Sequence, residues 1–92
     1  MSNVFSAIDL YHMTGDQLPA IDLHGIRLLQ SAEEVLEKEL YQLSTDNGSA
    51  CRIIHGIGSG AMKEMVHEVL AHHPLVSEFR MSEDGGSTIV VF

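Results

Sequence analysis

Two histidines, each followed by a glycine, are the residues of this sequence best suited to chemistry. The first closes Ile21-Asp22-Leu23-His24-Gly25, and the second lies in Ile53-Ile54-His55-Gly56. Both segments are typical of short buried strands, and open α/β sheets bind their ligands outside the carboxyl ends of the strands. We therefore expect both histidines at one edge of a sheet, in one shared site.

Asp22 and His24 are two residues apart, and alternate residues of a strand lie on the same face. A carboxylate beside an imidazole fixes its tautomer and raises its basicity. With His55 nearby, the pair predicts an acid–base site for phosphodiester cleavage. The alternative for each histidine is a structural hydrogen-bonding role, which is the commoner role at a strand end.

Glycines occupy alternate positions at Gly56, Gly58 and Gly60, and a helical pattern begins at Ala61. Glycine permits positive φ and close backbone approach, while a helix N-terminus presents free amides and a positive dipole end. The loop therefore predicts an anion site, with amides that could hold a phosphate and Arg27 as a possible cation. It matches neither the dinucleotide fingerprint nor the phosphate-binding Lys-Ser/Thr loop. A tight strand-to-helix turn without a ligand is the alternative.

The sequence predicts no dedicated metal site and requires no cofactor. It holds no Cys–Cys pair and no His-Glu-x-x-His spacing, and His72 and His73 are neighbours that point in different directions. A divalent metal remains an option, because Asp22, His24 and His55 could hold one transiently.

The elements that would position these residues follow from periodicity. Strands are expected at 20–23, 51–55, 76–81 and 88–92. A first helix is expected to begin at Ser31, which forms a capping box with Glu34. A second helix is expected over 61–72. The order β-α-β-α-β-β predicts an α/β two-layer sandwich, with a four-stranded mixed sheet and two helices on one face. Strand 88–92, apolar on both faces, should be central, and strand 76–81 should be an edge. Residues 1–19 are expected to form an N-terminal arm, and residues 20–92 the domain.

Composition and charge narrow the class of protein. The 92 residues suit one domain, with 45% hydrophobic residues and one cysteine, Cys51, expected to be a buried thiol. Without a secretory signal or an apolar run of membrane-spanning length, a cytoplasmic protein is expected. The net charge of −8, from 13 acids against 5 bases, opposes polyanion binding, which normally uses clustered Lys and Arg.

The paired motifs resemble those of the Smr (small MutS-related) domain family. Asp22-Leu23-His24-Gly25 and His55-Gly56-x-Gly58-x-Gly60 are similar to its two signatures, and 85–92 is similar to its Gly-Gly…Thr-x-Val closing strand. The likeness covers residues 20–92, including Pro74, Val76 and Phe79. It implies an α/β sandwich and nuclease candidates Asp22, His24 and His55. The nucleic-acid-binding candidates are then Gly25, Arg27, Gly56, Gly58, Ser59, Gly60 and Lys63.

The chain departs from that family's nuclease pattern at Ile57, where a lysine is usual, and in its acidic charge. Two functions from different classes are therefore expected. The first is a stand-alone domain that binds DNA or RNA and nicks phosphodiester bonds as an endonuclease. The second is a non-catalytic protein-interaction module, for example ribosome- or repair-associated. The oligomeric state is left open.

Overall fold

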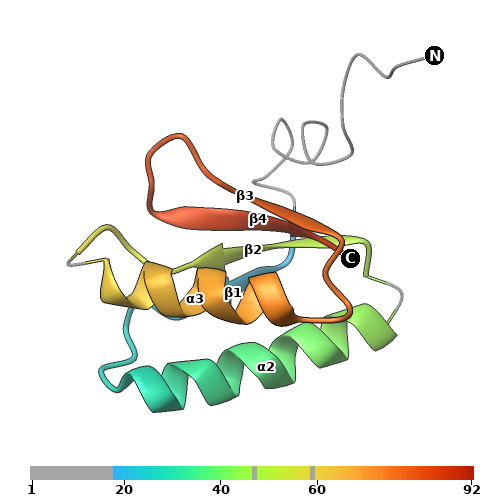
Figure 1. Ribbon diagram of the computed structural model, residues 1–92, viewed down its shortest axis with the longest axis horizontal. Helices are drawn as coiled ribbons and strands as arrows, with labels where there is room; N and C mark the ends of the chain where they lie inside the picture. The colour runs from blue at the N-terminus through green and yellow to red at the C-terminus, as the bar shows by residue number, and fades with distance from the viewer. Residues whose placement is uncertain (1–17, 47, 59) are drawn as a thin grey trace.

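The computed structural model describes residues 18–46, 48–58 and 60–92. Their elements follow the predicted order β-α-β-α-β-β. In chain order they are β1 (Ala20–Asp22), α2 (Leu29–Thr45), β2 (Ala50–Ile54), α3 (Ala61–His72), β3 (Glu78–Met81) and β4 (Ser87–Val91). Both helices lie on one side of the sheet (Figure 1), so the predicted two-layer α/β sandwich is confirmed.

The four strands form one mixed sheet in the order β1-β2-β4-β3. Strand β1 runs parallel to β2, while β4 is antiparallel to both β2 and β3. The prediction of a central closing strand is confirmed, because every residue of β4 is buried. Strand β3 lies at the edge, and its alternation of polar and apolar residues suits one solvated face.

The core lies between the helices and the sheet. The apolar stripe of α2 buries Leu36 and Leu40, and that of α3 buries Val66 and Leu70. Cys51 lies in the same core, where burial raises the pKa of its thiol to about 12, so it packs as a small apolar group. The predicted buried thiol is confirmed.

The opposite face of the sheet carries a smaller apolar cluster of Ala50, Ile89 and Val91, with Leu18 packed against it. The peptide carbonyl of Pro19 accepts a hydrogen bond of 2.9 Å from the Arg52 amide, which ties the start of the domain to β2. The predicted N-terminal arm lies outside the described residues except for Leu18 and Pro19.

The ends of the two helices were predicted with different success. Helix α3 spans 61–72 as expected, because Gly60 precedes it and Pro74 follows it. The expected start of the other helix at Ser31 is wrong, because α2 begins at Leu29 and Leu28 caps it without a side-chain bond. A tight turn from the Ile26 amide to the Leu23 carbonyl reverses the chain early, which allows the earlier start. None of the helices in the described part of the chain is long and apolar enough to span a membrane.

Candidate functional site

Asp22 and His24 form a hydrogen-bonded pair at the carboxyl end of β1. Asp22 Oδ1 lies 2.5 Å from His24 Nδ1 and also accepts a 3.1 Å bond from the His24 amide. These bonds lower the pKa of the Asp22 carboxyl below its usual value. A carboxylate can only accept, so Nδ1 carries the proton and the lone pair of the neutral ring is on Nε2. The His24 side chain is 62% exposed and that of Asp22 is 53% exposed. The lone pair on His24 Nε2 is therefore available to a ligand.

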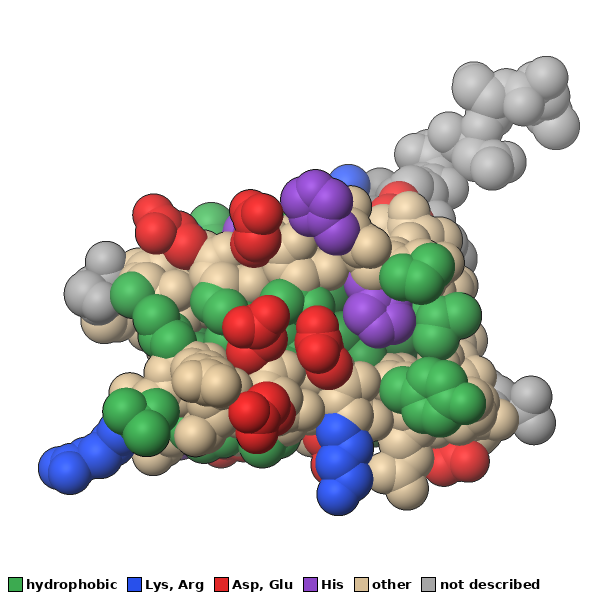
Figure 2. Space-filling view, turned by 60° about the horizontal axis from the view of Figure 1, so that its bottom comes forward, with side chains coloured by type: hydrophobic (Ala, Val, Ile, Leu, Met, Phe, Trp, Pro, Cys, Tyr) green, Lys and Arg blue, Asp and Glu red, His purple; other side chains and the backbone are tan. Residues whose placement is uncertain are grey.

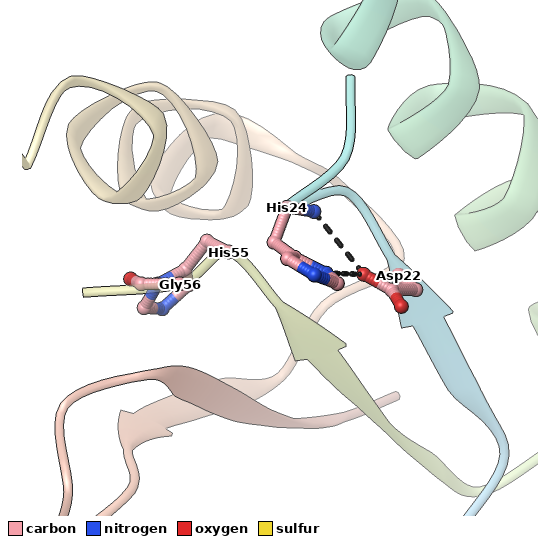
Figure 3. Close-up of polar contacts among 4 residues, drawn as sticks. All are labelled: Asp22, His24, His55 and Gly56. Carbon is pink, nitrogen blue, oxygen red and sulfur yellow. Dashed lines mark hydrogen bonds and ion pairs between the residues drawn. The ribbon is translucent and has the colours of Figure 1, made fainter. Parts of the chain in front are cut away.

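The register of β1 and β2 turns the side chains of the two histidines in different directions. Asp22 is paired with Ile54, so His24 lies beside Gly56 rather than beside His55. A Cβ atom on Gly56 would stand 3.4 Å from the His24 Cβ. His55 follows Ile54 and so faces the helix layer. In Figure 3 the ring of His24 turns to Asp22, whereas the ring of His55 points away from this pair.

His55 is only 4% exposed, and both its ring nitrogens have partners inside the protein. Nδ1 donates to the carbonyl of Gly56 at 3.0 Å, and Nε2 lies 2.9 Å from Thr88 Oγ1. His67 Nε2 lies 2.9 Å from the same hydroxyl. With a neutral His55 ring, Thr88 donates to His55 and accepts from His67. Burial lowers the pKa of His67, with smaller contributions from His55 and Lys63.

The three loop glycines have different structural reasons to be glycine. Gly56 and Gly60 adopt φ of 80° and 91°, in the left-handed region that favours glycine. Gly58 has neither a positive φ nor any atom within 4 Å of the position of a Cβ. Neither backbone strain nor a neighbouring atom in the fold therefore requires glycine at position 58.

One hollow, here called the loop hollow, lies between this loop and the start of α3. Its volume is about 170 Å³, and both histidines line it together with Gly58, Gly60 and Lys63. The first intrahelical bond joins the Glu64 amide to the Gly60 carbonyl, so the amides of Met62 and Lys63 precede it at the positive end of the helix dipole. The loop hollow thus combines amides, a cation and His24.

A second hollow, here called the sheet hollow, lies on the face of the sheet away from the helices. Its volume is about 330 Å³, and its lining includes His24, Arg52, Ile54 and Asp84. Hydrogen bonds from Ser82 and the Gly86 amide, together with the Arg52 charge, lower the pKa of Asp84. Sequence reasoning did not place Arg52 or Asp84 in the candidate site, although Arg52 alternates with Ile54 on the same strand.

The turn between β3 and β4 is fixed against the glycine loop. The carbonyl of Gly86 accepts hydrogen bonds from the amides of His55, at 3.1 Å, and Gly56, at 2.9 Å. This connection brings Asp84 to the site from a segment far along the chain. Thr88 and His67 were also missed, because nothing in their spacing predicts that they share a bond with His55.

Other predicted residues lie at the margin of the site. Gly25 and Arg27 are exposed in the connection to α2, and neither lines the loop hollow or the sheet hollow. Ser59 lies outside the described residues. Within 18–92, apart from residues 47 and 59, no three His, Cys, Asp or Glu side chains gather in a way that could hold a metal ion.

The open mixed sheet, with a glycine loop and an Asp–His pair at its strand ends, defines a small α/β domain. The Smr domain matches residues 21–92. The chain therefore belongs to the Smr domain family, and the resemblance read from its two motifs is confirmed.

Relatives differ widely in length from this chain. Endonuclease MutS2 of Halothermothrix orenii is 35% identical over 75 residues, which are 79% of this chain but 9% of that protein. Ribosome rescue factor SmrB of Shewanella baltica is 37% identical over 82 residues, 84% of this chain and 46% of SmrB. The chain thus spans less than half the length of these curated relatives.

Two solved structures share the fold. The Smr domain of Thermus thermophilus MutS2 superposes with a TM-score of 0.75 at 26% identity, covering 80% of this chain and 96% of that one. YdaL, a stand-alone small MutS-related protein from Escherichia coli, gives a TM-score of 0.78 at 14% identity, covering 100% and 79%. At that identity, YdaL supports the fold alone.

Proposed function

We propose that this Smr domain binds nucleic acid through a phosphate in the loop hollow and cleaves a phosphodiester bond with His24. The observation that carries the proposal is the exposed Asp22–His24 pair, with Nε2 free to act, beside a hollow lined by glycines and Lys63. Relatives named as an endonuclease and as a ribosome rescue factor support a nucleic-acid or ribosomal partner.

The loop hollow holds the phosphate by backbone and charge. The amides at the start of α3 point along the helix dipole, which favours an anion by about 0.3–1 kcal/mol at an exposed site. Lys63 adds a cation, and the open space at Gly58 lets the phosphate approach the backbone. These donors also stabilise the negative charge that develops on the phosphorus oxygens during transfer.

His24 acts as the general base. Nε2 takes a proton from a water molecule while the oxygen of that water forms a bond to phosphorus. The bond from phosphorus to the leaving oxygen then breaks, and the imidazolium returns the proton to that oxygen. Asp22 holds the ring in the required tautomer. One water is consumed, so the step balances.

His55 has a positioning role in this scheme. Its bonds to Gly56 and Thr88 hold the glycine loop against β4. The buried ring therefore affects the reaction indirectly, by fixing the position of the loop. Its other predicted role, as a direct acid–base partner of His24, requires the ring to leave these two bonds. The Asp22 carboxylate is the group beside His24 that could hold a divalent metal, because both ring nitrogens of His24 are committed in this scheme.

The test is cleavage of labelled RNA and of supercoiled DNA, with and without Mg²⁺ or Mn²⁺. His24→Ala should reduce the rate by about 10²–10⁴-fold, the usual contribution of a general base. His72→Ala is the matched control, because His72 is an exposed histidine at the far end of α3. Cleavage that survives in His24→Ala would refute the catalytic assignment.

The acidic helix layer favours the second candidate, a protein-interaction module. Exposed glutamates gather over both helices (Figure 2), and they suit a basic protein surface. If the protein binds no nucleic acid at low salt, the proposal of a nucleic-acid-binding domain is refuted and the protein-interaction module remains.

A further inference from the structure

The sheet hollow adjoins the loop hollow, where phosphate is proposed to bind, and has no part in that proposal. It shares His24, Gly56 and Ile57 with the loop hollow. Its volume of about 330 Å³ lies at the low end of the roughly 300–1,000 Å³ of small-molecule sites. A ligand of about the size of one nucleobase fits such a space.

Two isoleucines give the sheet hollow apolar walls. Ile54 faces it from β2, and Ile57 stands on the loop with 71% of its surface exposed. An exposed isoleucine between two hollows is costly in water and useful under a flat apolar ring. A base that leaves water here covers both side chains.

The polar rim offers donors on one side and an acceptor on the other. Nε of Arg52 is shielded from solvent and has no hydrogen-bond acceptor within the described ranges. Asp84 Oδ1 accepts from the Ser82 hydroxyl at 2.7 Å and from the Gly86 amide at 2.9 Å. These bonds fix the carboxylate, and they leave Oδ2 as the oxygen suited to an outside donor.

We propose that the sheet hollow is a subsite for the guanine base of an unpaired nucleotide; this proposal rests on the phosphate binding proposed above. Guanine O6 and N7 accept from Arg52, and its N1–H and N2–H₂ donate to Asp84. Uracil and hypoxanthine lack the exocyclic amino donor. The N1 and N2 edge is free only when guanine is unpaired, so the subsite selects single-stranded nucleic acid.

Short single-stranded oligonucleotides with one base among abasic positions separate the two proposals. The single base is guanine, hypoxanthine or 7-deazaguanine, and a fully abasic strand reports phosphate binding alone. We expect guanine to bind about tenfold more tightly than the abasic strand and than hypoxanthine, as measured by fluorescence anisotropy. Loss of N7 in 7-deazaguanine should weaken binding to the wild-type protein but change nothing in Arg52→Lys, which keeps the charge without the planar fork.

Asp84→Asn and Glu83→Gln form a matched pair, because each removes one negative charge from the same turn and Glu83 does not line the hollow. Asp84→Asn should lose the preference for guanine over hypoxanthine, while Glu83→Gln should keep it. Melting temperatures verify that both variants fold, and the hypoxanthine comparison in the wild-type protein needs no variant at all.

The outcomes distinguish the two proposals. Equal affinity of the wild-type protein for the guanine and abasic strands would overturn the guanine subsite and leave phosphate binding intact. Absence of binding to every strand would overturn both. A guanine preference that persists unchanged in Asp84→Asn would overturn the assignment of Asp84 as its reader.

Discussion

At the scale of single residues, the two histidines that look alike in sequence do different work. His24 is exposed and has one nitrogen committed to Asp22, so its other nitrogen can meet a ligand. His55 is buried, and both its nitrogens are committed to Gly56 and Thr88. A group that exchanges protons with substrate needs access, and one that positions a loop needs fixed partners. The geometry therefore supports the proposed chemistry at His24 and a positioning role for His55.

Thr88→Val tests the supporting role, because valine keeps the shape of threonine and loses the hydroxyl. Thr88 is fully buried, and its removal leaves His55 and His67 each without a bond at Nε2. We expect the free energy of unfolding to fall by about 1–3 kcal/mol, the usual cost of leaving buried polar groups unsatisfied. Urea denaturation measures it. Thr88→Ser, which retains the hydroxyl, should lose less, and a Val variant as stable as the wild-type protein would contradict the hydrogen-bond assignment.

At the scale of elements, the site depends on how three connections meet at one end of the sheet. The glycine loop joins β2 to α3, the β3–β4 turn is bonded to it through Gly86, and the end of β1 lies alongside. Positive φ at Gly56 and Gly60 turns the chain from the strand into the helix. The loop is thus fixed at both its ends, and between them Gly58 lines the loop hollow.

Gly60→Ala and Gly58→Ala test this division of the loop. Alanine at Gly60 must adopt φ near 91°, which costs roughly 1–2 kcal/mol of stability. Alanine at Gly58 meets no atom within 4 Å, so stability should change by no more than about 0.5 kcal/mol. Nucleic-acid affinity should fall for Gly58→Ala, because its methyl group enters the loop hollow. Thermal denaturation and anisotropy measure the two effects, and equal destabilisation by both alanines would refute the distinction.

The sequence predicted elements better than their register. Gly60 and Pro74 delimit α3 in the sequence itself, and the two-faced apolar run of β4 indicates a central strand. The pairing of Asp22 with Ile54 is a tertiary fact, and a shift of one residue would have placed His55 on the face of His24. The Asp22–His24 contact is local and was predicted. Arg52 and Asp84 come together only through the order of the strands, which no local pattern specifies.

At the scale of the whole molecule, acidic and basic side chains lie in different places: the helix layer is acidic, and three basic side chains lie near the strand ends. The net charge is −8, and several exposed glutamates lie on the helix layer (Figure 2). The site end has Arg52 and Lys63 in the two hollows and Arg27 in the adjoining connection. The helix layer therefore repels a polyanion, whereas at the strand ends the proposed phosphate would meet these cations beside the carboxylates of Asp22 and Asp84. This division predicts contact with a short stretch of nucleic acid rather than with an extended groove.

The salt dependence of binding measures how many phosphates this small cationic end neutralises. Lys63 and Arg27 are the two cations left for phosphate when Arg52 contacts the base, so the slope of log Kobs against log salt should be about −1.4 for a single strand, since each neutralised phosphate contributes about −0.7. Lys63→Gln should reduce the magnitude of the slope by about 0.7. Lys38→Gln is the matched control, because Lys38 is exposed on α2, and it should leave the slope unchanged. Anisotropy titrations of a single-stranded oligonucleotide over a series of salt concentrations give both values. A slope several times steeper would mean that phosphates also bind outside the strand ends, and a slope of zero would remove phosphate as the ligand.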